Sequence, residues 1–104
     1  MKEKALEVIK EILSKKGLKI VKIILFGSRA RGDFKWESDW DFLVVIDKEL
    51  TFTEKHQIID EIQIQLAKLK IPNDIIIKSE KQFSIMKEYP GNISFYAYQE
   101  GQEI

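Results

Sequence analysis

Two aspartates lie two positions apart at the start of a strongly apolar run. Asp39 and Asp41 lead into residues 42–46, whose composition is typical of a buried strand. Side chains two apart in a strand point the same way, so these carboxylates repel each other unless a cation neutralises them. Mg²⁺ favours one or two carboxylates completed by water and substrate phosphate oxygens. The pair predicts a divalent-metal site, although a solvent-exposed strand end would also accommodate it.

A glycine and a serine follow an earlier apolar run. Gly27 and Ser28 come after the β-branched residues 20–26, where a strand would turn into a short helix. Glycine permits close approach of a phosphate, and a serine hydroxyl with nearby backbone N–H groups can donate to it. The only two arginines, Arg29 and Arg31, come directly afterwards, and guanidinium groups bind phosphate in a bidentate manner. The segment predicts a phosphate-binding turn, although Gly-Ser alone is also an ordinary turn.

A third aspartate opens another apolar run. Asp74 directly precedes residues 75–77, and after Pro72-Asn73 it could simply form a turn. If this strand lies beside that of Asp41, the aspartates could act together. Three carboxylates would then hold two metals about 3.5 to 4 Å apart, an arrangement that supports in-line displacement at phosphorus.

Periodic apolar residues predict the elements that position these groups. We expect strands over 20–26, 39–46 and 74–78, a short helix within 27–33, and helices over 5–13, 51–70, 79–87 and 92–100. Thr51 with Glu54 and Ser79 with Gln82 have the spacing of capping boxes. The order predicts an α/β fold with a small mixed sheet flanked by helices. Leu69 and Tyr96 belong to apolar helix faces expected to pack inside, and Trp40 is expected in the core or an interface. Trp36 could stack on a base, but core packing is the expected use.

Composition excludes several classes of site and partner. At 104 residues, the chain suits a single domain over 1–104. It has no cysteine and one histidine, which excludes thiolate and His-rich metal sites. Seventeen basic residues balance 17 acidic ones with no basic stripe, so direct nucleic-acid binding is not expected. With no signal-like or membrane-spanning apolar segment, the chain is expected in the cytoplasm.

The segment from Gly27 to Asp41 resembles a known family. Gly27-Ser28, then Ala30-Arg31-Gly32, then Ser38-Asp39-Trp40-Asp41 are similar to the signature of minimal nucleotidyltransferase (MNT) domains. These domains belong to the DNA polymerase β-like superfamily. The ten residues between Ser28 and Asp39 suit that superfamily's spacing, and the resemblance extends over essentially the whole chain. It implies a polymerase β-like nucleotidyltransferase fold.

The resemblance also implies roles for single residues. Asp39 and Asp41 match the metal-binding pair, and Asp74 matches the third catalytic, metal-binding carboxylate. Gly27 and Ser28 match the turn that binds the nucleotide triphosphate. Arg31 falls on a signature position, whereas Arg29 falls on a variable one. The implied cofactors are Mg²⁺, in a two-metal site, and ATP as nucleotide donor.

Many MNT domains are encoded beside a HEPN-domain ribonuclease and neutralise it as an MntA-type antitoxin, by adenylating a tyrosine. By this resemblance we expect a protein adenylyltransferase with a HEPN toxin as partner. Two alternatives stay open. A small-molecule nucleotidyltransferase of the antibiotic-modifying type would normally carry a further helical domain. A non-catalytic binding module would inhibit its partner by occlusion, without needing intact carboxylates.

Overall fold

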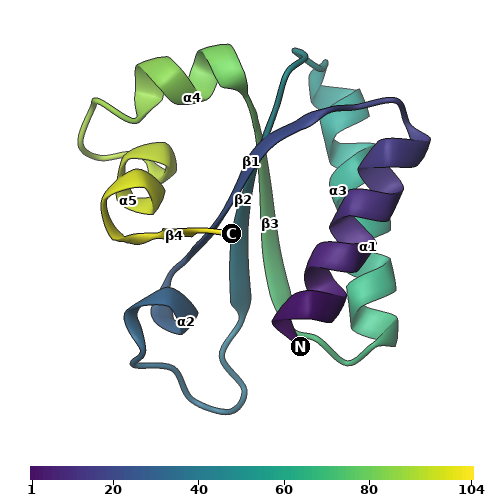
Figure 1. Cartoon of the computed structure of the whole chain (residues 1–104), viewed down its shortest axis with the longest axis vertical. Helices are drawn as coiled ribbons and strands as arrows, with labels where there is room; N and C mark the ends of the chain where they lie inside the picture. Colours follow the sequence, from purple (N-terminus) through teal and green to yellow (C-terminus); the bar gives the residue numbers. More distant parts are fainter.

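A four-stranded mixed sheet lies between two helical layers in the computed structural model, which describes residues 1–104 (Figure 1). The strands are β1 (Ile20–Phe26), β2 (Trp40–Ile46), β3 (Asn73–Ser79) and β4 (Gln102–Glu103). The helices are α1 (Lys2–Lys15), α2 (Ser28–Arg31), α3 (Phe52–Lys68), α4 (Glu80–Met86) and α5 (Ile93–Glu100). The sheet order is β3-β2-β1-β4, with β2 and β3 parallel and the other two pairs antiparallel. The predicted α/β fold with a small mixed sheet is confirmed.

Alternating side chains of the central strands fill two separate cores. α1 and α3 cover one face of the sheet, and α4 and α5 lie on the other (Figure 1). In β2, Phe42 and Val44 pack into the α1–α3 core, whereas Leu43 and Val45 pack into the smaller core beneath α4 and α5. This is why the strand reads as a continuous apolar run rather than an alternating one.

Both predicted capping boxes are present. The Thr51 hydroxyl accepts a hydrogen bond from the Glu54 backbone N–H at 3.1 Å, and the Glu54 carboxylate accepts one from the Thr51 N–H at 2.9 Å. Ser79 and Gln82 repeat the arrangement at the start of α4. These caps satisfy N–H groups that have no partner within the helix. None of the five helices combines the length and hydropathy needed to cross a bilayer.

Three side chains expected in the interior lie outside it. Leu69 is 48% exposed because α3 ends at Lys68, before the apolar stripe would return to the sheet. Tyr96 is also 48% exposed, since α5 buries the smaller Ser94 and Ala97 instead. Trp36 is 88% exposed, in a loop that no other element covers. The expectation of burial was wrong for all three, whereas Trp40 packs against the α1–α3 core as predicted.

The two-residue strand β4 was not predicted. Gln102 and Glu103 pair with Leu25 and Ile24 of β1, and the backbone N–H of Ile104 donates to the carbonyl of Ile23. Two polar residues are too few to form an alternating pattern. The pairing nevertheless returns the end of the chain to the sheet beside α2 (Figure 1).

Candidate active site

Asp41 lies between the other parts of the predicted site. Its register partner on β1 is Phe26, the residue before Gly27, and its register partner on β3 is Asp74. Because β1 runs antiparallel to β2 and β3 runs parallel to it, the end of β1 meets the starts of the other two strands. The sheet therefore brings Gly27, Asp41 and Asp74 to one edge, and the third strand lies beside the second, which is the condition under which the three aspartates could act together.

The three aspartates differ in exposure. Asp41 is the first side chain of β2 that points toward the α4–α5 face, and it is half-buried. Asp39 lies one residue before the strand and is exposed, so the predicted strand started one residue too early. Asp74 is exposed near the start of β3. Asp41 thus forms the floor of the site, and the other two carboxylates form its rim.

The raised pKa of Asp41 reflects its burial and an excess of negative charge at the site. Burial raises the pKa of Asp41 to about 6, with further upward contributions from Asp74 and then Asp39. Arg31 is the one group that acts in the opposite direction. Like charges that disfavour one another's ionised form are the environment in which a bound cation is most strongly stabilised.

The donor set fits a hard divalent cation. Asp39, Asp41 and Asp74 offer carboxylate oxygens, which Mg²⁺ prefers, and their exposed rim leaves room for water and phosphate oxygens. The structure contains no ready-made group of three or more His, Cys, Asp or Glu side chains that could hold an ion. The carboxylates share an edge without forming a closed cage, and the two-metal arrangement stays a prediction.

The backbone conformation of Gly27 and its closeness to Asp41 both disfavour any other residue at this position. Its φ of 74° and ψ of −160° fall in a region that is essentially restricted to glycine. A Cβ at this position would also collide with Oδ2 of Asp41. Ser28 follows as the first residue of α2 and is half-buried. The turn therefore passes directly over the carboxylate, where a nucleotide phosphate and a cation held by Asp41 would be neighbours.

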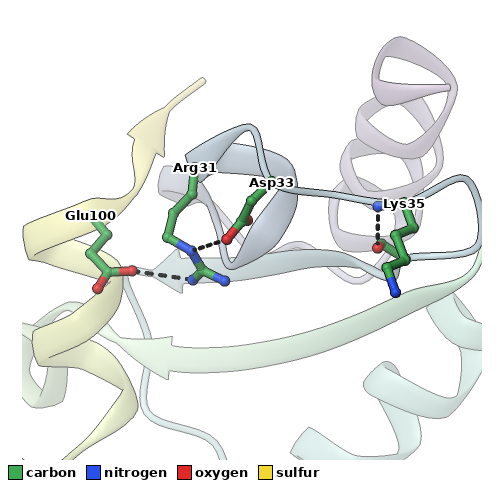
Figure 2. A network of polar contacts seen from close by, with 5 residues as sticks. Arg31, Asp33, Lys35 and Glu100 are labelled. Atoms are coloured by element: carbon green, nitrogen blue, oxygen red, sulfur yellow. Dashed lines mark hydrogen bonds and ion pairs between the residues drawn. The ribbon is translucent and has the colours of Figure 1, made fainter.

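Arg31 is already engaged by two carboxylates. Its Nη1 donates to Oε2 of Glu100 at 3.3 Å, and its Nε contacts Oδ2 of Asp33 at 3.4 Å. Figure 2 shows the guanidinium between these two side chains. The charge of Asp33 and the hydrogen bond to Glu100 raise the pKa of Arg31. A phosphate bound by Arg31 would compete with these exposed partners.

Arg29 has a different environment. Its Nε and Nη2 donate to the carbonyl of Ser38 at 3.3 and 3.1 Å, and Nη2 also donates to the carbonyl of Trp36 at 3.1 Å. The guanidinium lies over the rings of Phe34 and Trp40, 4.4 and 4.6 Å from their centroids. The guanidinium of Arg29 therefore binds the loop before Asp39, whereas that of Arg31 lies at the other end of α2, beside α5.

The end of the chain contributes contacts that sequence reasoning missed. Besides Glu100, the side chain of Gln102 donates to the carbonyl of Ala30 in α2 at 3.3 Å. These residues are about seventy positions from their partners, and no local pattern could have identified them.

The site lies on an open edge of the molecule. Four hollows mark the surface, and the largest, of about 570 Å³, lies between α1, the first half of β1 and the end of the chain. None of the four is lined by Asp39, Asp41, Asp74, Gly27 or Ser28. Asp39 and Asp74 are exposed at this edge, whereas Asp41 is half-buried between them.

Comparison with known proteins gives consistent results. Residues 7–100 match the family described as "Polymerase beta, Nucleotidyltransferase". The Methanocaldococcus jannaschii protein named "Putative protein adenylyltransferase MJ0604" is 40% identical over 83 residues, which cover 79% of this chain and 78% of that protein. A second M. jannaschii protein with the corresponding name is 49% identical over 41 residues, which cover 39% of this chain and 41% of the relative.

Two solved structures have a similar fold. One is a toxin-antitoxin crystallised with AMP-PNP, with a TM-score of 0.60 and 18% identity, covering 93% of this chain and 69% of that one. The other is a mutant of the toxin-antitoxin MntA-HpeT, with a TM-score of 0.59 and 17% identity, covering 95% of this chain and 70% of that one. At these identities the likeness concerns the fold.

Proposed function

Because the chain belongs to the polymerase beta nucleotidyltransferase family, we propose that this nucleotidyltransferase moves AMP from ATP to a hydroxyl group of a partner protein. The observation that carries the proposal is the placement of Asp41 between Gly27 and Asp74 at one edge of the sheet. This edge combines a turn suited to phosphate with carboxylates suited to a divalent cation.

The reaction is a displacement at the α-phosphorus of ATP. The acceptor oxygen bonds to that phosphorus, the bond to the bridging oxygen breaks, pyrophosphate leaves, and the hydroxyl proton passes to a carboxylate or to solvent. Divalent Mg²⁺, when bound, supplies charge stabilisation for the phosphoryl group and activates the hydroxyl. Asp39, Asp41 and Asp74 are the residues that would hold it. Gly27 and Ser28 would orient the triphosphate, and Arg31 would neutralise part of its charge.

A protein is the acceptor that the open site favours. The relative MJ0604, which matches most of the chain, carries the name of a protein adenylyltransferase. In this chain Asp39 and Asp74 are exposed on the rim, with no pocket around them that would orient a small acceptor. A folded partner can supply that orientation by docking.

We further propose that the partner is a HEPN-type ribonuclease toxin, modified at a tyrosine, with this chain as its antitoxin in the cytoplasm. The solved structures with a similar fold are toxin-antitoxin complexes, and this supports a toxin as partner. An AMP group near a ribonuclease site would inhibit it, because the added anion would repel RNA phosphates.

The test combines this protein, the product of the adjacent reading frame, ATP and Mg²⁺, followed by intact mass spectrometry of both chains. We expect the partner to gain one AMP with the wild type and with Asp60→Asn, which removes an exposed carboxylate from α3. Asp41→Asn, or chelation of Mg²⁺, should abolish the gain. A fully inhibited but unmodified partner in a stable complex would instead establish a binding module.

A further inference from the structure

The loop that carries Asp39 has little packing of its own. Phe34 is 48% exposed and Trp36 is 88% exposed, so the two large apolar side chains of the loop are poorly buried. Within the loop, the backbone N–H of Ser38 donates to the carbonyl of Lys35 at 3.0 Å, and the Ser38 hydroxyl accepts from the Lys35 N–H at 2.8 Å. These bonds close one turn but do not attach it to the sheet.

Arg29 attaches this loop to the rest of the fold. Its guanidinium donates to the carbonyls of Trp36 and Ser38 and lies over Phe34, on the loop, and Trp40, in β2. The carbonyl of Ser38 belongs to the peptide group that continues into Asp39. The orientation of that peptide group determines where the backbone directs the Asp39 side chain, because Asp39 lies outside the regular hydrogen bonding of β2.

We propose that Arg29 is a positioning residue, which fixes the peptide between Ser38 and Asp39 so that Asp39 can share a divalent cation with Asp41. A planar guanidinium can donate to two carbonyls and stack on rings at once, which a lysine ammonium cannot do. Some side chains do not bind a metal themselves but hold its ligands in the correct orientation. Removing such a side chain typically lowers metal affinity or activity by about 10- to 100-fold. The effect of Arg29 on AMP transfer rests on the proposed function, whereas its effects on loop order and cation binding do not.

Three variants distinguish the positioning role of Arg29 from the effect of its charge and from a loss of folding. Arg29→Met keeps an apolar stem but removes the donors, and Arg29→Lys keeps the charge but loses the planar fork. Lys35→Met is the matched control, because it removes a positive charge from the loop that Arg29 contacts while keeping the backbone N–H that donates to the Ser38 hydroxyl. Thermal unfolding establishes that each variant is folded. If Arg29→Met does not fold, Arg29→Lys is the variant used for the test.

Two measurements read the role directly. Hydrogen exchange of the backbone N–H groups of residues 33–39 reports the order of the loop. Quenching of tryptophan fluorescence by Mn²⁺ reports cation binding locally, since the chain's two tryptophans, Trp36 and Trp40, flank Asp39. We expect Arg29→Met to speed exchange in this segment and to raise the Mn²⁺ midpoint by about tenfold. Arg29→Lys should fall between Arg29→Met and the wild type, and Lys35→Met should match the wild type.

Transfer kinetics give a third readout. The Mg²⁺ concentration for half-maximal transfer should rise in Arg29→Met, and saturating Mg²⁺ should restore much of the rate. Unchanged exchange and an unchanged Mn²⁺ midpoint in folded Arg29 variants would overturn the inference. A wild type that shows the expected Mn²⁺ and exchange behaviour but transfers no AMP would overturn the proposed function alone.

Discussion

Asp41 and Asp74 are register partners on the parallel strands β2 and β3, so their side chains leave the same face of the sheet side by side. Asp74 is the largest charged contributor to the raised pKa of Asp41. The pair is unfavourable without a cation, and the proposed function would supply one at this edge beside Gly27.

We predict that Asp41→Asn abolishes transfer without unfolding the protein. Loss of an outer-shell partner of a metal site costs about 10- to 100-fold, so loss of a proposed ligand should lower the transfer rate by more than about 100-fold. The free energy of unfolding should stay constant or rise by on the order of 1 kcal/mol, because a half-buried carboxylate among like charges is removed and solvent screens part of the effect. Asp74→Asn, at an exposed position, should change stability less. Urea unfolding and single-turnover transfer measure the two quantities, and retained transfer by Asp41→Asn would refute the catalytic assignment.

We predict that Gly27→Ala is more damaging than an alanine at another glycine of positive φ. The Gly27 backbone region costs other residues about 1 to 3 kcal/mol, and the new Cβ would also collide with the Asp41 carboxylate. Gly32→Ala is the matched control, since Gly32 has a φ of 90° but nothing within 4 Å of a Cβ. We expect a loss of at least about 2 kcal/mol for Gly27→Ala against about 1 kcal/mol for Gly32→Ala. Equal losses in urea unfolding would show that the contact with Asp41 is unimportant.

The strands and the central part of the site followed from local patterns. Apolar runs located β1, β2 and β3 to within a residue or two, because strands buried on both faces need continuous apolar sequence. Alternation of side chains predicted that Asp39 and Asp41 share one face, although Asp39 lies one residue before β2. Their proximity to Asp74 required only that the second and third strands be neighbours, and they are.

The remaining contacts depend on how distant segments dock. The pairing of Arg31 with Glu100 joins residues 69 positions apart and requires α5 to lie against the sheet. The strand β4 exists only because α5 directs the end of the chain toward β1. For Arg29, the sequence indicated phosphate-binding chemistry, whereas its guanidinium binds carbonyls of a loop whose path no local periodicity determines.

Stability should depend on the capping box at the start of α3. Thr51→Ala should lower the free energy of unfolding by about 1 kcal/mol and Tm by about 4 to 8 °C, because the Glu54 N–H loses its acceptor. Thr53→Ala removes an exposed hydroxyl from the same turn and should have little effect. A Tm for Thr51→Ala within a degree of the Thr53→Ala value would rule out the cap as a stabilising feature.

The same cap predicts a pH dependence. Hydrogen bonds from the Thr51 backbone and side chain lower the pKa of Glu54 below its ordinary value of 4.5. A carboxylate with a depressed pKa stabilises the folded state above its unfolded pKa, and this stabilisation is lost as the pH falls through the folded pKa. Glu54→Gln should therefore unfold more easily than the wild type at pH 7, and the difference should shrink as the pH falls below 4.5 and vanish below the folded pKa of Glu54. Thermal unfolding of both proteins across this range measures it, and a difference that persists in acid would exclude the Glu54 charge as its source.

Glu100 forms an exposed ion pair with Arg31 and would compete with a nucleotide phosphate for its guanidinium. Arg31 must exchange its contacts with Asp33 and Glu100 for phosphate oxygens if it neutralises the triphosphate. Glu100→Gln keeps the shape of the side chain but removes its charge, so both the competition for Arg31 and the repulsion of the nucleotide decrease. We expect the Kd for the Mg²⁺ complex of a non-hydrolysable ATP analogue, measured by calorimetry, to fall only a few-fold, because the ion pair is exposed and screened by solvent. Glu103→Gln is the matched control, because Glu103 is also near the end of the chain but pairs with Lys22. The gain should shrink at high salt, which screens exposed charges. Weaker binding by Glu100→Gln would mean that Glu100 orients Arg31 for the phosphate rather than competing with it.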